Sequence, residues 1–168
     1  MNIATRLAQL RRSPLWHVQP PSGLPQVEAG HVLPADVIEF YEHCGGLELN
    51  SDSAYSIEIV PPSDVVRANL QMLTGLSEKQ VRESLGDRSW NWYVIAVAIG
   101  SGDDIVIDLE ESRHGRCYEG FHETYALQGQ SPIIAWSFTD LLDRIIASPG
   151  EYFYWMEPTF DHLGDAYD

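Results

Sequence analysis

The stretch WYVIAVAIGSGDDIVIDL, residues 92–109, decides the fold of this 168-residue chain. Residues 93–99 are apolar at every position and rich in β-branched side chains, which is typical of a strand covered on both faces. Residues 105–110 alternate between an apolar face and a more polar one. Glycine and aspartate at 100–104 supply the backbone freedom and local hydrogen bonds that a strand connection needs. The stretch therefore predicts a central hairpin with an acidic tip.

Further strand patterns follow and precede this hairpin. A turn at Arg113-His114-Gly115 leads into a third strand, so a meander is expected over about residues 93–122. Shorter strands are predicted at 47–49, 55–60 and 133–136, the last as an edge strand. Strict alternation along the central strand places Tyr93, Ile95, Val97 and Ile99 on one face and Val94, Ala96 and Ala98 on the other.

Helical periodicity occurs in the segments between these strands. The predicted helices are 2–11, one opened by Pro34 and stopped by Gly45-Gly46, 63–73, 77–85, and one capped by Ser137 and ended by Pro149-Gly150. We expect a glycine of Gly45-Gly46 in the αL conformation, and Val66, Leu70 and Leu73 facing inward. Ser77 and Gln80 form a capping box. The fold class is α+β, with helices packed on a mainly antiparallel sheet.

Two terminal segments flank this pattern. We expect residues 1–168 to form a single domain. Residues 1–30 combine the first helix with a proline-rich loop at 13–30, where no regular structure is expected. Residues 148–168 form an aromatic, acidic tail that we expect to dock on the domain or on a partner.

Charge is the strongest compositional signal. The net charge is −15, and residues 89–168 carry 3 basic and 14 acidic groups, against 7 and 11 in residues 1–88. Such acidity opposes binding to nucleic acid or to an anionic membrane and favours a basic protein partner. The two cysteines suggest no disulfide framework, and the N-terminus has no continuous apolar segment of the kind found in secretory signals. Both features fit a cytoplasmic protein.

The sequence contains no arrangement that predicts catalysis or cofactor binding. Gly100-Ser101-Gly102 lacks the third glycine of a dinucleotide loop, and no G-x-S-x-G motif occurs. Five possible metal ligands lie close together, but strand alternation separates His114 and His122 from Cys117, Glu119 and Glu123. Asp103, Asp104 and Asp108 are expected to make turn hydrogen bonds and to be solvated. We therefore expect no catalytic residue, no cofactor and no metal.

The order of these elements resembles the SUKH superfamily, the Smi/Knr cell-wall-synthesis-regulator family, over about residues 31–147. The residues that carry the resemblance are Leu33-Pro34, Gly45-Gly46, Ile99-Gly100 followed by SGDDIVID at 101–108, Gly115, and IAWSF at 134–138 leading into Leu141-Leu142. Cys44 replaces an asparagine that the family often has before its glycine pair. The resemblance implies an α+β domain that binds proteins without enzymatic activity, and many bacterial relatives are similar to immunity proteins that neutralise toxins.

These observations support an immunity-type protein that occludes a basic toxin. The expected partner-binding residues are Asp103, Asp104, Glu110, Glu111, Glu119 and Trp155. A regulatory or scaffolding module with another protein partner is the first alternative. An enzyme or small-ligand binder, whose site would assemble only in three dimensions, is the second.

Overall fold

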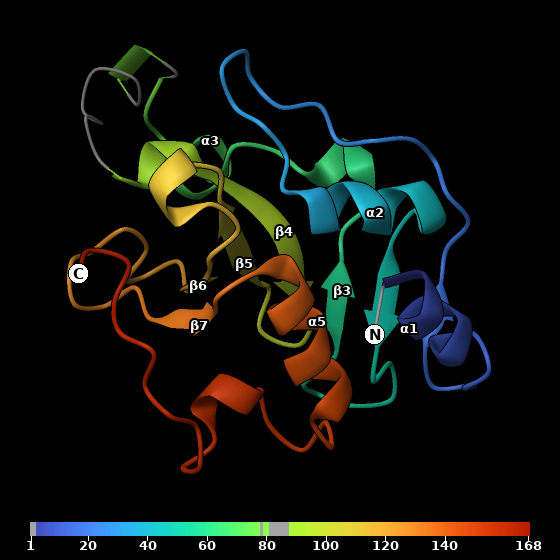
Figure 1. Ribbon diagram of the computed structural model, residues 1–168. Helices are drawn as coiled ribbons and strands as arrows, with labels where there is room; N and C mark the ends of the chain where they lie inside the picture. The colour runs from blue at the N-terminus through green and yellow to red at the C-terminus, as the bar shows by residue number, and fades with distance from the viewer. Residues whose placement is uncertain (1–2, 78, 81–87) are drawn as a thin grey trace.

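A computed structural model describes residues 3–77, 79–80 and 88–168 of the chain. It contains a seven-stranded antiparallel sheet whose spatial order follows the sequence, from β1 to β7 (Figure 1). The strands are β1 His17–Val18, β2 Leu47–Leu49, β3 Ile57–Ile59, β4 Trp92–Ala98, β5 Asp103–Asp108, β6 Cys117–Gly120 and β7 Ile133–Ala135. The α+β fold class and the predicted meander are both confirmed.

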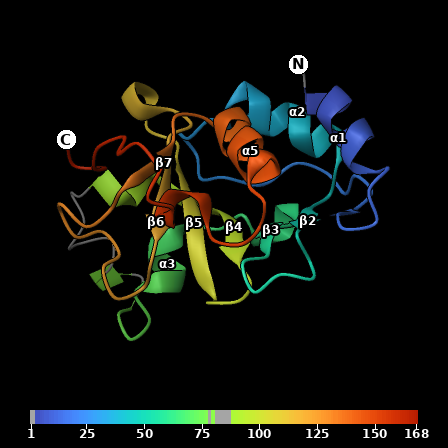
Figure 2. The ribbon, with the colours of Figure 1, turned by 90° about the horizontal axis from the view of Figure 1, so that it is seen from below.

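Helices cover both faces of this sheet. The α-helices described are α1 Ile3–Leu10, α2 Ala35–His43, α3 Ala68–Met72 and α5 Phe138–Ala147, and the 3-10 turns are η1 Pro62–Asp64, η2 Arg88–Asn91, η3 Glu111–Arg113 and η4 Tyr154–Met156. Figure 2 shows α1, α2 and α5 as one layer above the strands, with α3 on the opposite side. Two faces are therefore available for burial, as the apolar central strand requires.

The central strand β4 is buried along nearly its whole length, but its side chains do not alternate as predicted. Val94 pairs with Val106, and Ala96 pairs with Ile105, so Ile95 is the extra residue of a β-bulge. The bulge moves the later residues to the opposite face from the one that strict alternation assigns. Ile99, expected in the core, is 45% exposed.

Helices α2 and α5 confirm the sequence prediction most fully. The predicted stripe of α2, which includes Phe40, is buried, and the Phe40 ring contacts Phe138 of α5 edge-on at 5.1 Å between centroids. Ser137 caps α5 by accepting a hydrogen bond from the Asp140 backbone N–H at 3.0 Å. The two helices thus pack together over the sheet through aromatic side chains.

The glycine pair after α2 does not adopt the αL conformation that we expected. Gly46 has φ of 152°, and a Cβ at Gly45 would lie 2.1 Å from the backbone oxygen of Pro20. Glycine is required at position 45 because the backbone of the proline-rich loop leaves no room for a Cβ atom there. That loop is not wholly irregular, since β1 pairs with β2 at the edge of the sheet. The expectation that proline and glycine exclude regular structure from 13–30 was therefore wrong.

The predicted helix over 63–73 is wrong in its start and in its buried face. The Val94 backbone N–H donates to the Val66 oxygen at 2.9 Å, so the chain is extended beside β4 before α3 begins. Val66 and Leu70 are 38% and 43% exposed, whereas Asn69 is fully buried. Pairing with the neighbouring strand overrides the local helical periodicity here.

The capping box at the next predicted helix is present. The Ser77 backbone N–H donates to Gln80 Oε1 at 2.9 Å, and the Gln80 N–H donates to Ser77 Oγ at 3.3 Å. The rest of the predicted helix, residues 78 and 81–85, lies outside the described residues. The structure therefore confirms the two capping hydrogen bonds and does not test the predicted helix.

The tail over 148–168 packs against the domain. The Tyr154 hydroxyl donates to the Ile134 backbone oxygen at 2.7 Å, and the Ile133 N–H donates to Gly164 O at 3.0 Å. These contacts cover the edge of β7 and hold the η4 turn against that strand. The tail is therefore packed onto the sheet as part of the domain.

Candidate partner-binding site

A largely apolar groove of about 420 Å³ lies between the hairpin tip and the C-terminal tail. We call it the tail groove; its lining residues are Ala98, Ser101, Asp103, Asp104, Ile105, Glu119, Phe121, Phe153, Trp155 and Met156. They come from β4, β5 and the turn between them, from the end of β6 and the residue after it, and from η4 and the residue before it. Four of the six residues predicted to bind a partner therefore lie around one groove.

Trp155 forms a fixed aromatic wall of the tail groove. Its ring stacks on Phe153 with centroids 5.0 Å apart and planes 7° from parallel. Its indole Nε1–H donates to Glu119 Oε1 at 2.8 Å. Tyr154 lies edge-on to the same indole, with centroids 4.9 Å apart. Because stacking, an edge contact and a hydrogen bond all restrain it, Trp155 loses little conformational entropy when a partner binds.

The two aspartates at the hairpin tip have different environments. Asp103 lies in the groove and its Oδ1 is 3.2 Å from His122 Nδ1. Asp104 is only 4% exposed, and its Oδ2 accepts a hydrogen bond from Gln71 Nε2 of α3 at 2.9 Å. Consecutive strand residues point to opposite faces, so the Asp104 carboxylate faces α3 rather than the Trp155 wall. Turn hydrogen bonding and solvation, expected for both, do not describe Asp104.

Burial is the main cause that raises the pKa of Asp104 to about 6. The hydrogen bond from Gln71 lowers this pKa, and the negative charge of Asp103 raises it. An unfolded aspartate has a pKa of about 3.9, so the folded protein binds more protons between about pH 4 and 6. We expect the Asp104 contribution to stability to fall on the order of 2 kcal/mol as pH rises through that window. Asp104→Asn, which keeps an oxygen for Gln71, removes this dependence.

Urea unfolding of wild type and Asp104→Asn at several pH values between 4 and 7 measures this effect. The difference in unfolding free energy between them is expected to move in favour of the variant as pH rises. A difference that stays constant over this range would show that Asp104 titrates normally in the folded protein.

The other two predicted residues, Glu110 and Glu111, lie at the opposite end of β5 from the hairpin tip. Glu111 is exposed, and the Glu110 carboxylate accepts from the Ser112 N–H at the start of η3. The structure does not bring them to the tail groove. A single compact interface that uses all six predicted residues would have to extend along β5.

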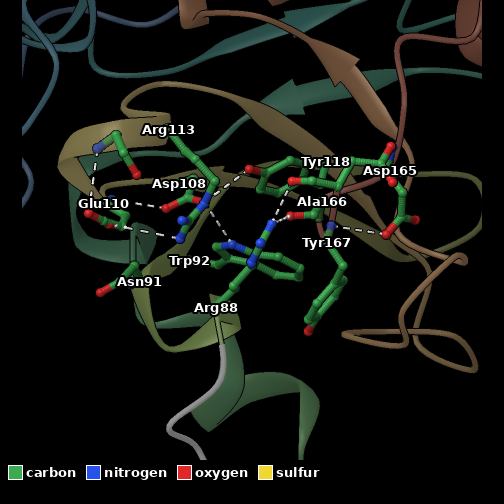
Figure 3. A network of polar contacts seen from close by, with 12 residues as sticks. Arg88, Asn91, Trp92, Asp108, Glu110, Arg113, Tyr118, Asp165, Ala166 and Tyr167 are labelled. Atoms are coloured by element: carbon green, nitrogen blue, oxygen red, sulfur yellow. Dashed lines mark hydrogen bonds and ion pairs between the residues drawn. The ribbon is translucent and has the colours of Figure 1, made fainter.

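At the same end of β5 as Glu110, Asp108 is the centre of a buried polar network that the sequence did not predict (Figure 3). Its Oδ2 accepts from Trp92 Nε1 at 3.1 Å, Tyr118 Oη at 2.9 Å and Arg113 Nε at 2.9 Å. Its Oδ1 accepts from the Glu110 N–H at 2.9 Å. Asp108 is fully buried, so the expectation that it would be solvated was wrong.

The network shapes the fold and offers no nucleophile or acid–base pair open to solvent. Burial and the Asp108 charge raise the pKa of Tyr118 far above its ordinary value, so its hydroxyl remains a donor. Nearby, Arg88 donates to the backbone oxygens of Ala166 and Asp168 at 2.9 and 2.8 Å, which ties the end of the tail to η2 (Figure 3). The signal that could have indicated burial of Asp108 was its position between apolar residues within a strand.

Neither thiol is arranged for nucleophilic chemistry. Cys44 and Cys117 are both buried, and burial raises the pKa of each. Cys44 Sγ donates to the Gly46 oxygen at 2.9 Å. Across the described part of the chain, no three histidine, cysteine or acidic side chains are placed to hold a metal ion.

Comparison with known proteins agrees with this architecture. The model of the SMI1 / KNR4 family (SUKH-1) matches residues 26–144. The chain belongs to this family. The matched range contains the whole sheet except β1, together with α2, α3 and most of α5. It excludes the η4 turn, so the Trp155 side of the groove lies outside the part that defines SUKH-1.

A curated relative extends the match. The chain is 38% identical over 146 residues to the protein named immunity protein YokJ of Bacillus subtilis strain 168. The alignment covers 87% of this SUKH-1 chain and 84% of the relative. No solved structure matches. None of the helices described here combines the length and apolar character that a membrane span requires.

Proposed function

We propose that this protein is an immunity-type protein that binds a protein toxin and blocks its activity by occlusion. The observation that carries the proposal is 38% identity, over 87% of the chain, to a protein named as an immunity protein. Membership of SUKH-1 supports it further. Binding rather than catalysis fits the described structure, whose polar network is buried and whose groove is apolar with carboxylates at its rim.

The toxin in this proposal is basic. Residues 89–168, which include the hairpin and the tail, carry a net charge of −11. A surface of one sign attracts an oppositely charged partner over long distances and accelerates encounter. The apolar lining of the tail groove would supply the desolvated centre that tight binding needs.

Growth protection in bacteria tests the proposed function. Toxin-like C-terminal domains encoded beside this gene would be expressed from an inducible promoter, alone or together with this protein. We expect one of them to stop growth alone and to form a complex with this protein that restores it. Restoration without a complex on gel filtration, or no protection against any such domain, would contradict the proposal. Capture of a housekeeping protein at high salt would favour scaffolding.

Charge reversal at the groove rim is expected to slow binding of the toxin domain. Asp103 is preferred over Asp104 because a lysine at the buried Asp104 would disrupt folding. For Asp103→Lys, we expect the association rate constant to fall about tenfold at low salt, with a weaker dependence on ionic strength. Stopped-flow fluorescence at two or more salt concentrations measures both quantities.

Glu42→Lys is the matched control for this experiment. It makes the same change in net charge, is exposed on α2, and does not line the groove. An equal loss in both variants would indicate that only total charge matters. Unchanged association in Asp103→Lys would place the interface elsewhere.

A further inference from the structure

The tail groove combines apolar walls with carboxylates and contains no lysine or arginine among its lining residues. Phe121, Trp155 and Met156 provide apolar surface, and Met156 is 63% exposed at the rim. Asp103 and Glu119 add two acidic groups from neighbouring strands. Such a site favours a ligand that is apolar along its length and cationic at its end.

We propose that the tail groove binds an arginine side chain of the partner protein, with its methylene stem against the apolar residues and its guanidinium beside Trp155 and Glu119. This proposal rests on the proposed function and names the chemistry of its contact. Long cationic side chains bury their stems on apolar surface and keep the charge at a polar rim. The net charge of −11 over residues 89–168 favours the cation over an anionic or neutral occupant.

The Trp155 ring and the Glu119 carboxylate together favour arginine over lysine. The Trp155 ring is planar, lines the groove and is held in position by Phe153 and Glu119. A guanidinium stacks on an aromatic ring and can also donate to a carboxylate, whereas an ammonium is a more strongly hydrated point charge. The same pairing already occurs within this fold, where the Arg67 guanidinium lies 3.8 Å from the centroid of the Trp90 ring.

The Glu119 carboxylate has capacity for a second partner. Its Oε1 accepts from the Trp155 indole, and a carboxylate has about four acceptor sites. It is therefore able to position the aromatic wall and to bind a cation at the same time. Substitution by glutamine separates these two roles, because an amide oxygen can still accept from the indole while the negative charge is lost.

The test is an NMR titration that needs no toxin. The probe is N-acetyl-arginine amide, with the uncharged isostere N-acetyl-citrulline amide and N-acetyl-lysine amide as comparisons. The indole N–H signal of Trp155 is assigned by its disappearance in Trp155→Phe. We expect the arginine probe to shift this signal saturably, with a dissociation constant on the order of millimolar. The lysine probe is expected to bind more weakly, and the citrulline probe to produce no saturable shift.

Variants locate the binding. Glu119→Gln is expected to weaken the arginine probe about three- to fivefold, as for a partly exposed ion pair, while the Trp155 indole signal stays near its original position. Glu111→Gln removes the same charge outside the groove and is expected to bind as wild type. Trp136, which is 46% exposed on the loop after β7, already has the Arg116 guanidinium 5.1 Å from its ring centroid and is expected not to shift.

Several results would overturn the arginine site. These are no saturable shift at Trp155, equal shifts with the citrulline probe, or equal weakening in Glu119→Gln and Glu111→Gln. None of them depends on the toxin, so growth protection can persist when the groove fails to bind arginine. If the arginine probe binds as expected but the protein does not protect growth, the result contradicts the proposed function alone.

Discussion

Asp108→Ala is expected to lower the free energy of unfolding by about 3–5 kcal/mol. The wild-type carboxylate is fully buried and accepts hydrogen bonds from Trp92, Tyr118, Arg113 and the backbone N–H of Glu110. Removing it leaves a guanidinium without its buried counter-charge and two aromatic donors without their acceptor. Each unsatisfied buried donor adds about 1–3 kcal/mol, and these penalties are not independent.

Asp108→Asn tests whether charge or shape is responsible. The amide has nearly the same size, but its NH₂ group replaces one acceptor with a donor, and the charge opposite Arg113 is lost. We therefore expect asparagine to recover only a small part of the alanine effect. Recovery to within about 1 kcal/mol of wild type would show that the charge is unimportant.

Glu110→Gln is the matched control. Glu110 Oε2 is 3.9 Å from Arg113 Nη2, beyond hydrogen-bond distance, and the Glu110 side chain is 31% exposed, so loss of this charge should cost less than about 1 kcal/mol. Urea denaturation followed by tryptophan fluorescence measures all three variants. A loss below about 1 kcal/mol for Asp108→Ala would contradict the structural importance of the network.

Phe40→Ala is expected to cost about 3–5 kcal/mol, because it removes a fully buried ring from the contact between α2 and α5. The cavity would adjoin Tyr41 and Phe138, whose ring centroids lie 5.0 and 5.1 Å from that of Phe40. Both helices are anchored on the sheet, so the site can collapse only in part. Thermal and urea unfolding of the purified variant measure the loss.

A double-mutant cycle refines this prediction. Phe40→Ala and Phe138→Ala together should cost less than the sum of the single variants, since the edge-on ring contact of about 0.5–1.5 kcal/mol is lost once only. Val32→Ala, at a side chain 65% exposed, is the apolar control and should change stability by less than about 0.5 kcal/mol. Strict additivity of the two phenylalanine variants would show that the rings do not interact.

Much of the core architecture could be predicted from local patterns. The uninterrupted apolar run of β4 indicates coverage on both faces, and the structure places that strand fourth of seven. The apolar stripes of α2 and α5 fix their buried faces, and Ser137 marks the start of α5. These predictions succeed because each depends on periodicity or capping within one short segment.

The candidate site could be predicted only in part. Asp103, Glu119 and Trp155 were chosen as acidic or aromatic residues on one half of the chain, and the groove brings them together. Glu110 and Glu111 were chosen on the same grounds and lie at the other end of β5. Residue type indicates what a surface can bind, but strand direction decides which residues share it.

By itself, the sequence determined the α+β class, the order of most strands and helices, and the acidic character of the second half. Tertiary structure alone decided that Ile95 forms a bulge and that the Asp104 and Asp108 carboxylates are buried. It also decided that the Trp155 indole donates a hydrogen bond to Glu119. The physical reason is the range of the interactions. Periodicity shows which side chains share a face, but burial depends on what distant segments place over that face.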